Sequence, residues 1–155
     1  MIVVVEERGA RGAVGRGVRA ALRRVERAAG LGGLEVTVVL TSDDEIARLN
    51  DTFRHKPRPT DVLSFAAWEG EPVPGAEHVL GDVVISVDTA RRQARELRHS
   101  LDEEVAVLLA HGLMHLLGLD HERGAEEARR QAECEMTVLA AAGVDPELAL
   151  SGRAI

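Results

Sequence analysis

Hydrophobic and polar positions follow two periods along the chain and predict four strands and five helices. Short runs rich in β-branched residues, one of them with alternating apolar and polar positions, are typical of strands. Apolar residues that recur every three or four positions indicate amphipathic helices. The predicted strands are Ile2–Val5, Leu34–Leu40, Val62–Ala66 and Val83–Val87. The predicted helices are Val14–Ala29, one that opens after Ser42 and continues through Leu49, Thr89–His99, Leu101–Leu117 and Glu126–Ala142.

Local signals mark the ends of these elements and the loops between them. Gly30 is placed to stop a helix, and Ser100 is placed to cap one. We expect polar loops at residues 53–60 and 69–78, and a loosely held tail from Pro146. Strands and helices are mixed without a regular alternation. The pattern therefore predicts one α+β domain over residues 1–155, with a small, mostly parallel or mixed four-stranded sheet packed against helices.

Composition and charge narrow the class of protein. An apolar content of 45% in 155 residues is enough for one core. The net charge of −7 argues against a generally basic nucleic-acid binder, and 2% aromatic residues argue against a surface rich in stacking rings. No apolar stretch has the length of a membrane span or a secretory signal, so we expect a cytoplasmic protein that contacts no membrane. Cys134 is the only cysteine and is predicted to be a small apolar helix residue.

Two groups of arginines recur at helical spacing. A charged stripe on an amphipathic helix is usually its solvated face, and contact with RNA phosphates is the less common alternative. The first stripe contains Arg16, Arg19, Arg23 and Arg27, and the second contains Arg91, Arg95 and Arg98.

Three histidines fall within eleven residues and predict a metal site on a helix and the turn that follows it. His111 and His115 are one helical turn apart, so their imidazoles share a face. His121 could not reach the same ion if the helix continued. Gly118 allows the helix to end in a left-handed conformation, so that the chain folds back toward the first two histidines.

The expected ion is Zn²⁺, although other divalent transition metals also bind imidazole. Three neutral imidazoles leave a fourth position for water, as in catalytic zinc sites. A fourth protein ligand would instead make the ion purely structural. Asp120 is the nearest candidate for a further role, either orienting an imidazole or accepting a proton from the water.

The spacing of the histidines also matches the metzincin proteases, but Gly112 stands where those enzymes carry a glutamate base. Peptide hydrolysis needs a carboxylate to move a proton to a poor leaving group, and glycine has none. A metalloprotease is therefore a weak alternative.

A phosphodiester makes a different demand, because its negative charge must be neutralised. A cation-rich segment before the third predicted strand meets this demand. Arg54, Lys56 and Arg58 are expected in a loop there. A solvated loop charge is the favoured interpretation for Lys56 and Arg58.

Three segments of the chain form recognisable motifs: NDTFR followed by PTDVLSF, then GDVVIS, and then HGLMHLLGLDH. Together they resemble the YbeY family, the bacterial endoribonucleases of ribosomal RNA maturation. They span nearly half the chain and follow the family's order. The sequence departs from the family pattern at Pro57, Leu119 and Ala66, none of which is a proposed ligand.

The resemblance implies a single-strand-specific, metal-dependent endoribonuclease that acts in 16S rRNA 3′-end maturation and ribosome quality control. The implied partners are single-stranded RNA, the ribosomal subunit and its proteins, and not DNA. By position, His111, His115 and His121 match the family's metal ligands, and Arg54 matches an arginine that contacts the RNA phosphate. The alternative from another class is a non-catalytic ribosome-assembly factor that keeps a structural metal.

Overall fold

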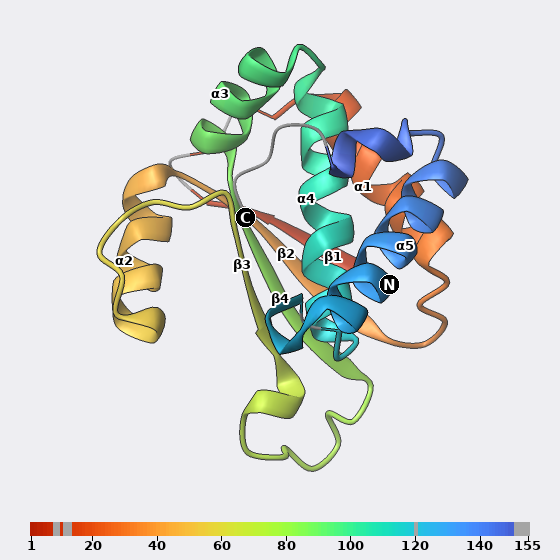
Figure 1. Ribbon diagram of the computed structural model, residues 1–155. Coiled ribbons are helices and arrows are strands. Elements are labelled where there is room, and N and C mark those ends of the chain that lie inside the picture. Colours follow the sequence, from red (N-terminus) through yellow and green to blue (C-terminus); the bar gives the residue numbers. More distant parts are fainter. Residues whose placement is uncertain (8–9, 11–13, 120, 151–155) are drawn as a thin grey trace.

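A mixed four-stranded sheet lies at the centre of the computed structural model (Figure 1), which describes residues 1–7, 10, 14–119 and 121–150. The strand order is β1-β2-β4-β3. Strands β1, β2 and β4 run parallel to one another, and β3 pairs antiparallel with β4 at the edge of the sheet. The strands are β1 (Ile2–Glu6), β2 (Glu35–Thr41), β3 (Val62–Ala66) and β4 (Val79–Ser86).

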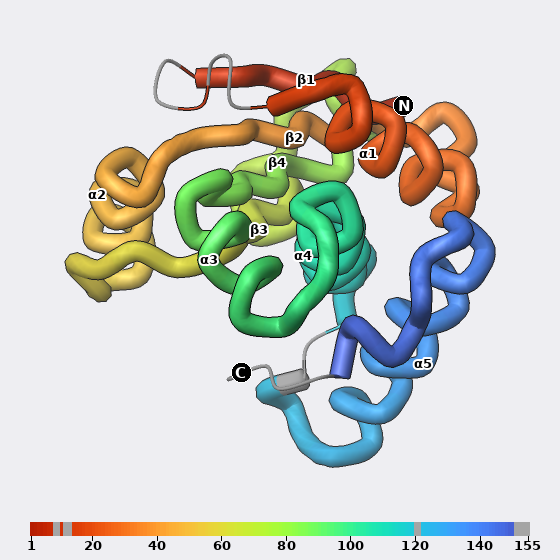
Figure 2. Tube along the Cα trace, turned by 90° about the horizontal axis from the view of Figure 1, so that it is seen from above, coloured from red at the N-terminus to blue at the C-terminus, as the bar shows by residue number. Residues whose placement is uncertain are grey.

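Helices cover both faces of this sheet, as Figure 2 shows from above. Helix α2 packs Ile46 against Leu63 and Val84 on one face. Helices α1, α4 and α5 lie on the other face, over the larger core. The described helices are α1 (Arg16–Ala29), α2 (Asp43–Arg54), α3 (Val87–Leu97), α4 (Leu101–Leu116) and α5 (Ala125–Ala141). No helix of the described residues is long and apolar enough to cross a membrane.

Helix α4 is the central element of the larger core. It is apolar on nearly every side because it contacts the sheet on one side and α1, α3 and α5 on the others. Ser100 caps its first turn: the Glu103 N–H donates to the Ser100 hydroxyl, and the Glu103 carboxylate accepts from the Ser100 N–H. The predicted α+β fold and the start of this helix are confirmed.

Several predicted element ends differ from the structure. Helix α2 continues to Arg54 because Asn50 is still on its buried side, and His55 ends it with φ 57°. Strand β4 starts at Val79, where its register with β2 is irregular. It ends one residue earlier than predicted, and Val87 is instead the first residue of α3. The expected exposed loop at residues 69–78 is confirmed from residue 70 onward, after a short turn, η2 (Ala67–Glu69). The tail is not loose throughout, because Ala149 in η4 (Pro146–Ala149) is buried in the core.

Candidate functional site

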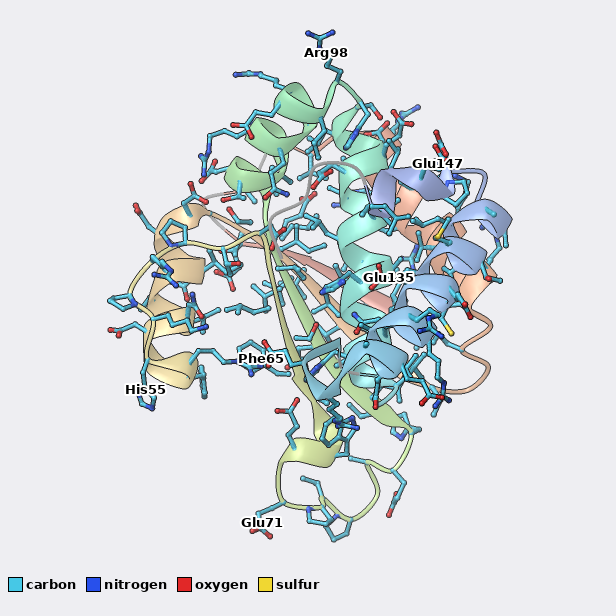
Figure 3. All side chains as sticks on the ribbon, in the orientation of Figure 1. His55, Phe65, Glu71, Arg98, Glu135 and Glu147 are labelled. Carbon is cyan, nitrogen blue, oxygen red and sulfur yellow. The ribbon has the colours of Figure 1, made fainter. Side chains whose placement is uncertain are left out.

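His111 and His115 lie on one side of α4, near its C-terminal end, and each meets a glutamate from another element. Nδ1 of His111 is 2.7 Å from Oε1 of Glu135 on α5, which Figure 3 labels. Nε2 of His115 is 2.7 Å from Oε1 of Glu69 on η2. The side chains of the two histidines are 31% and 25% exposed, so both rings are accessible from outside.

The turn after α4 has the geometry that the sequence predicted. Gly118 has φ 92°, and its N–H donates to the His115 carbonyl while the Leu119 N–H donates to the Met114 carbonyl. This pair of bonds is the Schellman arrangement, which needs a residue tolerant of positive φ at its centre. The chain therefore reverses after the second histidine, and the turn η3 (His121–Arg123) follows.

Two predicted site residues fall outside what the structure describes. Asp120 lies outside the described residues, as does the side chain of His121. Among the described residues no group of three His, Cys, Asp or Glu side chains is placed to hold an ion. The structure thus brings His111 and His115 together, and a third ligand at position 121 stays a prediction.

Gly112 has a packing reason to be glycine. A Cβ atom there would lie 2.7 Å from Cγ1 of Val83 and 3.0 Å from Oγ of Ser64. The Ser64 hydroxyl also donates to the Gly112 carbonyl over 3.2 Å. Position 112 therefore faces the sheet, and the absence of a side chain there lets α4 pack closely against β3 and β4. A glutamate base at this position would collide with the sheet.

Arg54 is the last residue of α2 rather than part of the loop in which the sequence placed it. Its guanidinium donates to the Ser64 carbonyl over 2.8 Å, and its carbon lies 5.7 Å from the ring centroid of Phe65. Phe65, labelled in Figure 3, points from β3 toward the C-terminal end of α2. The edge strand β3 thus holds Arg54 on one side and, through Ser64 and Gly112, the histidine helix on the other.

A cleft of about 770 Å³ joins these parts. Arg54 and both histidines line it, so the structure brings together the predicted phosphate contact and two predicted metal ligands. Lys56 and Arg58 also line it, from an exposed loop, which agrees with the solvated loop charges that the sequence suggested. Asn50, which is 4% exposed, fixes their loop by donating to the Arg58 carbonyl over 3.0 Å.

The motif-bearing residues gathered in the cleft invite a comparison with known proteins. A family model described as Endoribonuclease YbeY matches residues 6–143. The chain belongs to the endoribonuclease YbeY family. The resemblance noted in the sequence is therefore confirmed.

Relatives and a solved structure agree with the family model. The endoribonuclease YbeY of Aquifex aeolicus (strain VF5) is 56% identical over 112 residues, which are 72% of this chain and 73% of that protein. The one from Picosynechococcus is 52% identical over 101 residues, 63% of this chain and 60% of the relative. The solution structure of a target protein from Thermotoga maritima is 27% identical, with a TM-score of 0.59 and 90% coverage of each chain. The YbeY fold assigned here is thus that of a known structure.

Sequence reasoning missed Glu69, which it left in an exposed loop. Partial burial raises the pKa of the Glu69 carboxyl, whereas hydrogen bonds from His115 and the Ala66 N–H lower it. The charges of His115 and Arg54 add to them, so the pKa lies below its usual value. The Glu69 carboxylate is therefore held as an anion beside the His115 ring. No spacing in the sequence connects it to His115, 46 residues away.

Glu135 was also missed, although the sequence carries a signal for it. Gln131, Glu135 and Leu139 recur every four residues and are the buried side chains of α5. Two polar residues on a buried stripe need partners. Here Gln131 donates to Glu135 over 3.1 Å, and Glu135 in turn meets His111. The two polar residues on the buried side of this helix could therefore have indicated that Glu135 supports a residue of the site.

The two arginine stripes and Cys134 are the remaining features that the sequence singled out. Among the residues that line the described cleft there is none from either arginine stripe. Arg19 pairs with Glu6 at 2.9 Å and Arg23 pairs with Glu26 at 3.2 Å, as solvated helix faces do. Cys134 lies on helix α5, as the sequence predicted, and its side chain is exposed.

Proposed function

We propose that this chain is a metal-dependent endoribonuclease that cleaves single-stranded RNA. The observation that carries the proposal is the cleft in which His111 and His115 face the same space as Arg54. Membership of the YbeY family, whose relatives are named endoribonucleases, supports RNA as the substrate.

The donor set fits a zinc ion held by His111, His115 and His121. Two imidazoles one helical turn apart can share one ion, and a carboxylate behind a ring is the usual support of a metal-ligating histidine. Glu135 provides this support for His111. When bound, zinc supplies Lewis acidity toward a phosphate oxygen and lowers the pKa of water. Asp120 is proposed as the nearby proton acceptor or as an orienting partner of an imidazole.

Arg54 is proposed to bind the scissile phosphate. A guanidinium has five N–H donors in a rigid fork, and one of them is used on the Ser64 carbonyl. That bond and the Phe65 ring fix the plane of the guanidinium, so that its remaining donors can meet phosphate oxygens with little loss of side-chain freedom. Lys56 and Arg58 add positive charge to the cleft along the proposed path of the RNA strand.

The cellular role that the family resemblance favours is 16S rRNA 3′-end maturation and ribosome quality control. Under this proposal the protein works in the cytoplasm on the small ribosomal subunit and its proteins. Local positive charge beside Arg54, in a chain whose net charge is −7, is consistent with binding one strand in a cleft rather than coating RNA broadly.

Cleavage of a labelled single-stranded oligoribonucleotide tests the proposal. We expect Arg54→Ala to slow cleavage by about a hundredfold to a thousandfold, the usual effect of removing one donor to a charged transition state. Arg48→Ala is the matched control, because Arg48 is an exposed cation on the same helix that pairs with Glu45. It should cleave like the parent protein. Normal cleavage by Arg54→Ala would refute the role of Arg54.

The non-catalytic alternative makes the opposite prediction. A ribosome-assembly factor with a structural metal would bind the small subunit and retain zinc, yet purified protein would leave the RNA intact. The ends of the cleaved RNA refine the chemistry. A 2′,3′-cyclic phosphate would show attack by the RNA's own 2′-hydroxyl rather than by water.

A further inference from the structure

The three aromatic side chains of the chain all lie around the candidate site. The sequence contains two phenylalanines, one tryptophan and no tyrosine. Phe53 and Phe65 meet edge to face with centroids 5.2 Å apart, and Phe65 supports Arg54. Trp68 follows on η2. The few aromatic residues therefore stand beside the two halves of the candidate site, the phenylalanines beside Arg54 and the tryptophan beside His115.

Trp68 is not a core residue. It is 52% exposed, although burial of an indole is strongly favourable. Its ring centroid lies 5.8 Å from that of His115, with a tilt of 35° between the planes. An exposed ring therefore stands directly beside a proposed metal ligand. A single exposed apolar residue needs no explanation elsewhere on a surface, but its position here calls for one.

The indole is also held in place. Its Nε1–H donates to the Leu116 carbonyl at the end of α4 over 3.1 Å. The turn that carries it is fixed on its other side, because the Glu69 carboxylate contacts His115 and accepts from the Ala66 N–H. A ring ordered before binding loses little conformational freedom when a ligand stacks on it.

We propose that Trp68 is a stacking platform for an unpaired RNA base next to the phosphate in the cleft. Proteins that bind single strands combine a basic groove with exposed aromatic rings on which bases stack. Arg54 contacts Ser64, and the four residues from there to Trp68 span at most about 14 Å of extended chain, or a few nucleotides. Trp68 does not itself line the cleft but stands beside His115, which does, so a base within a few nucleotides of the phosphate at Arg54 can reach the indole.

This inference rests on the proposed function, because the cleft sets the path of the strand. It also supplies a reason for single-strand preference. Bases in a duplex are stacked on each other, so their faces are not available to the indole. The competing explanation is that Trp68 only satisfies the terminal carbonyl of α4. That role depends on the indole N–H, whereas stacking depends on the ring.

Trp68 is the only tryptophan, so its fluorescence reports directly on the proposed contact. The full chain is titrated with a single-stranded RNA 12-mer, with the same 12-mer paired to its complement, and with an abasic 12-mer that keeps the sugar–phosphate backbone. We expect strong quenching by the single strand and little by the other two. Equal quenching by the abasic strand would overturn the proposal.

Affinity measurements on two variants separate the contribution of the Trp68 ring to RNA binding from that of its N–H group. Trp68→Ala should weaken single-strand binding by about tenfold or more, the usual effect of losing one stacked base, with duplex and abasic binding unchanged. Trp68→Phe, which keeps a ring and loses the N–H, should retain most of the affinity. Val73→Ala is the matched control, because Val73 is an exposed apolar residue in the loop after Trp68. Circular dichroism confirms that each variant is folded.

The outcomes distinguish this inference from the function on which it rests. Parent-like single-strand affinity in Trp68→Ala, with normal cleavage, refutes stacking and leaves the endoribonuclease proposal intact. An equal loss in Trp68→Phe and Trp68→Ala also refutes it in favour of the helix-end role. Selective quenching without any RNA cleavage supports stacking and removes the catalytic proposal.

Discussion

Histidine–glutamate pairs occur at both ends of α4, with nearly identical contacts and very different surroundings. At the N-terminal end, Nε2 of His99 lies 2.6 Å from Oε1 of Glu104, and their side chains are 4% and 0% exposed. At the C-terminal end, His111 meets Glu135 at 2.7 Å, and about a third of the His111 side chain is exposed in a cleft.

The difference shows that the contact alone does not define a site. The Glu104 carboxylate is enclosed by protein and also accepts from Gln93 over 2.7 Å, so its bonds hold α3 and α4 together. The C-terminal pair has the same chemistry but opens toward Arg54 across the cleft. A pair that is fully enclosed stabilises the fold, whereas a pair with one accessible ring can bind a ligand.

The largest effect that would test this comparison is expected from Glu104→Ala. Removing one partner of a buried hydrogen-bonded pair leaves the other without compensation and costs about 3–5 kcal/mol. We expect that loss in the free energy of unfolding by urea, with normal cleavage per folded molecule. A variant that stayed fully stable but lost cleavage would contradict the division between the two ends.

A change at the C-terminal end of α4 should have the opposite effects: it should impair the site and leave the free energy of unfolding nearly unchanged. Glu135→Ala is expected to weaken zinc binding by about 10- to 100-fold, because the carboxylate orients the His111 ring. Competition with a chelator of known affinity measures this change. Glu133→Ala, at an exposed position on the same helix, is the control and should bind zinc like the parent. Equal affinity in both variants would remove the supporting role of Glu135.

The smallest effect concerns pH and the first turn of α4. The hydrogen bond from the Ser100 N–H lowers the pKa of the Glu103 carboxyl; partial burial opposes it, while the Ser100 hydroxyl and the His99 charge reinforce it. The folded pKa therefore lies below the ordinary 4.5, and the unfolded chain binds the proton first. The stability that this group contributes is present above about pH 4.5 and is lost as the pH falls below it.

Glu103→Gln tests this sign. The amide can still accept from Ser100 but does not titrate, so the variant should lose less stability than the parent between pH 6 and pH 3. We expect a difference of less than about 1 kcal/mol, since the group is partly solvated. Urea unfolding across this pH range measures it. Parallel pH profiles for the two proteins would show that Glu103 contributes nothing to acid sensitivity.

The parts of the fold that the sequence predicted depend on local signals. The start of α4 follows from Ser100 and Glu103, and the turn after it follows from Gly118. The pairing of His111 with His115 needs only the helical period. These features involve residues within a few positions of each other, so a short window of sequence is enough to predict them.

The parts that were missed depend on contacts between distant segments. The extension of α2 to Arg54 depends on Asn50, whose amide meets the Arg58 carbonyl. The role of Glu69 depends on a turn that returns beside His115, and the use of Trp68 depends on the end of α4. Neither spacing nor composition carries the information about Glu69 and Trp68, because only tertiary packing brings these two residues beside α4.

The most direct test of the central claim is RNA cleavage by metal-depleted protein to which zinc is restored. The full chain is stripped with a chelator, checked for retained fold by circular dichroism, and assayed on a single-stranded oligoribonucleotide before and after addition of Zn²⁺. The proposed site predicts that cleavage disappears on depletion, returns with zinc in the parent and does not return in His111→Ala. Undiminished cleavage by folded, metal-free protein would contradict it.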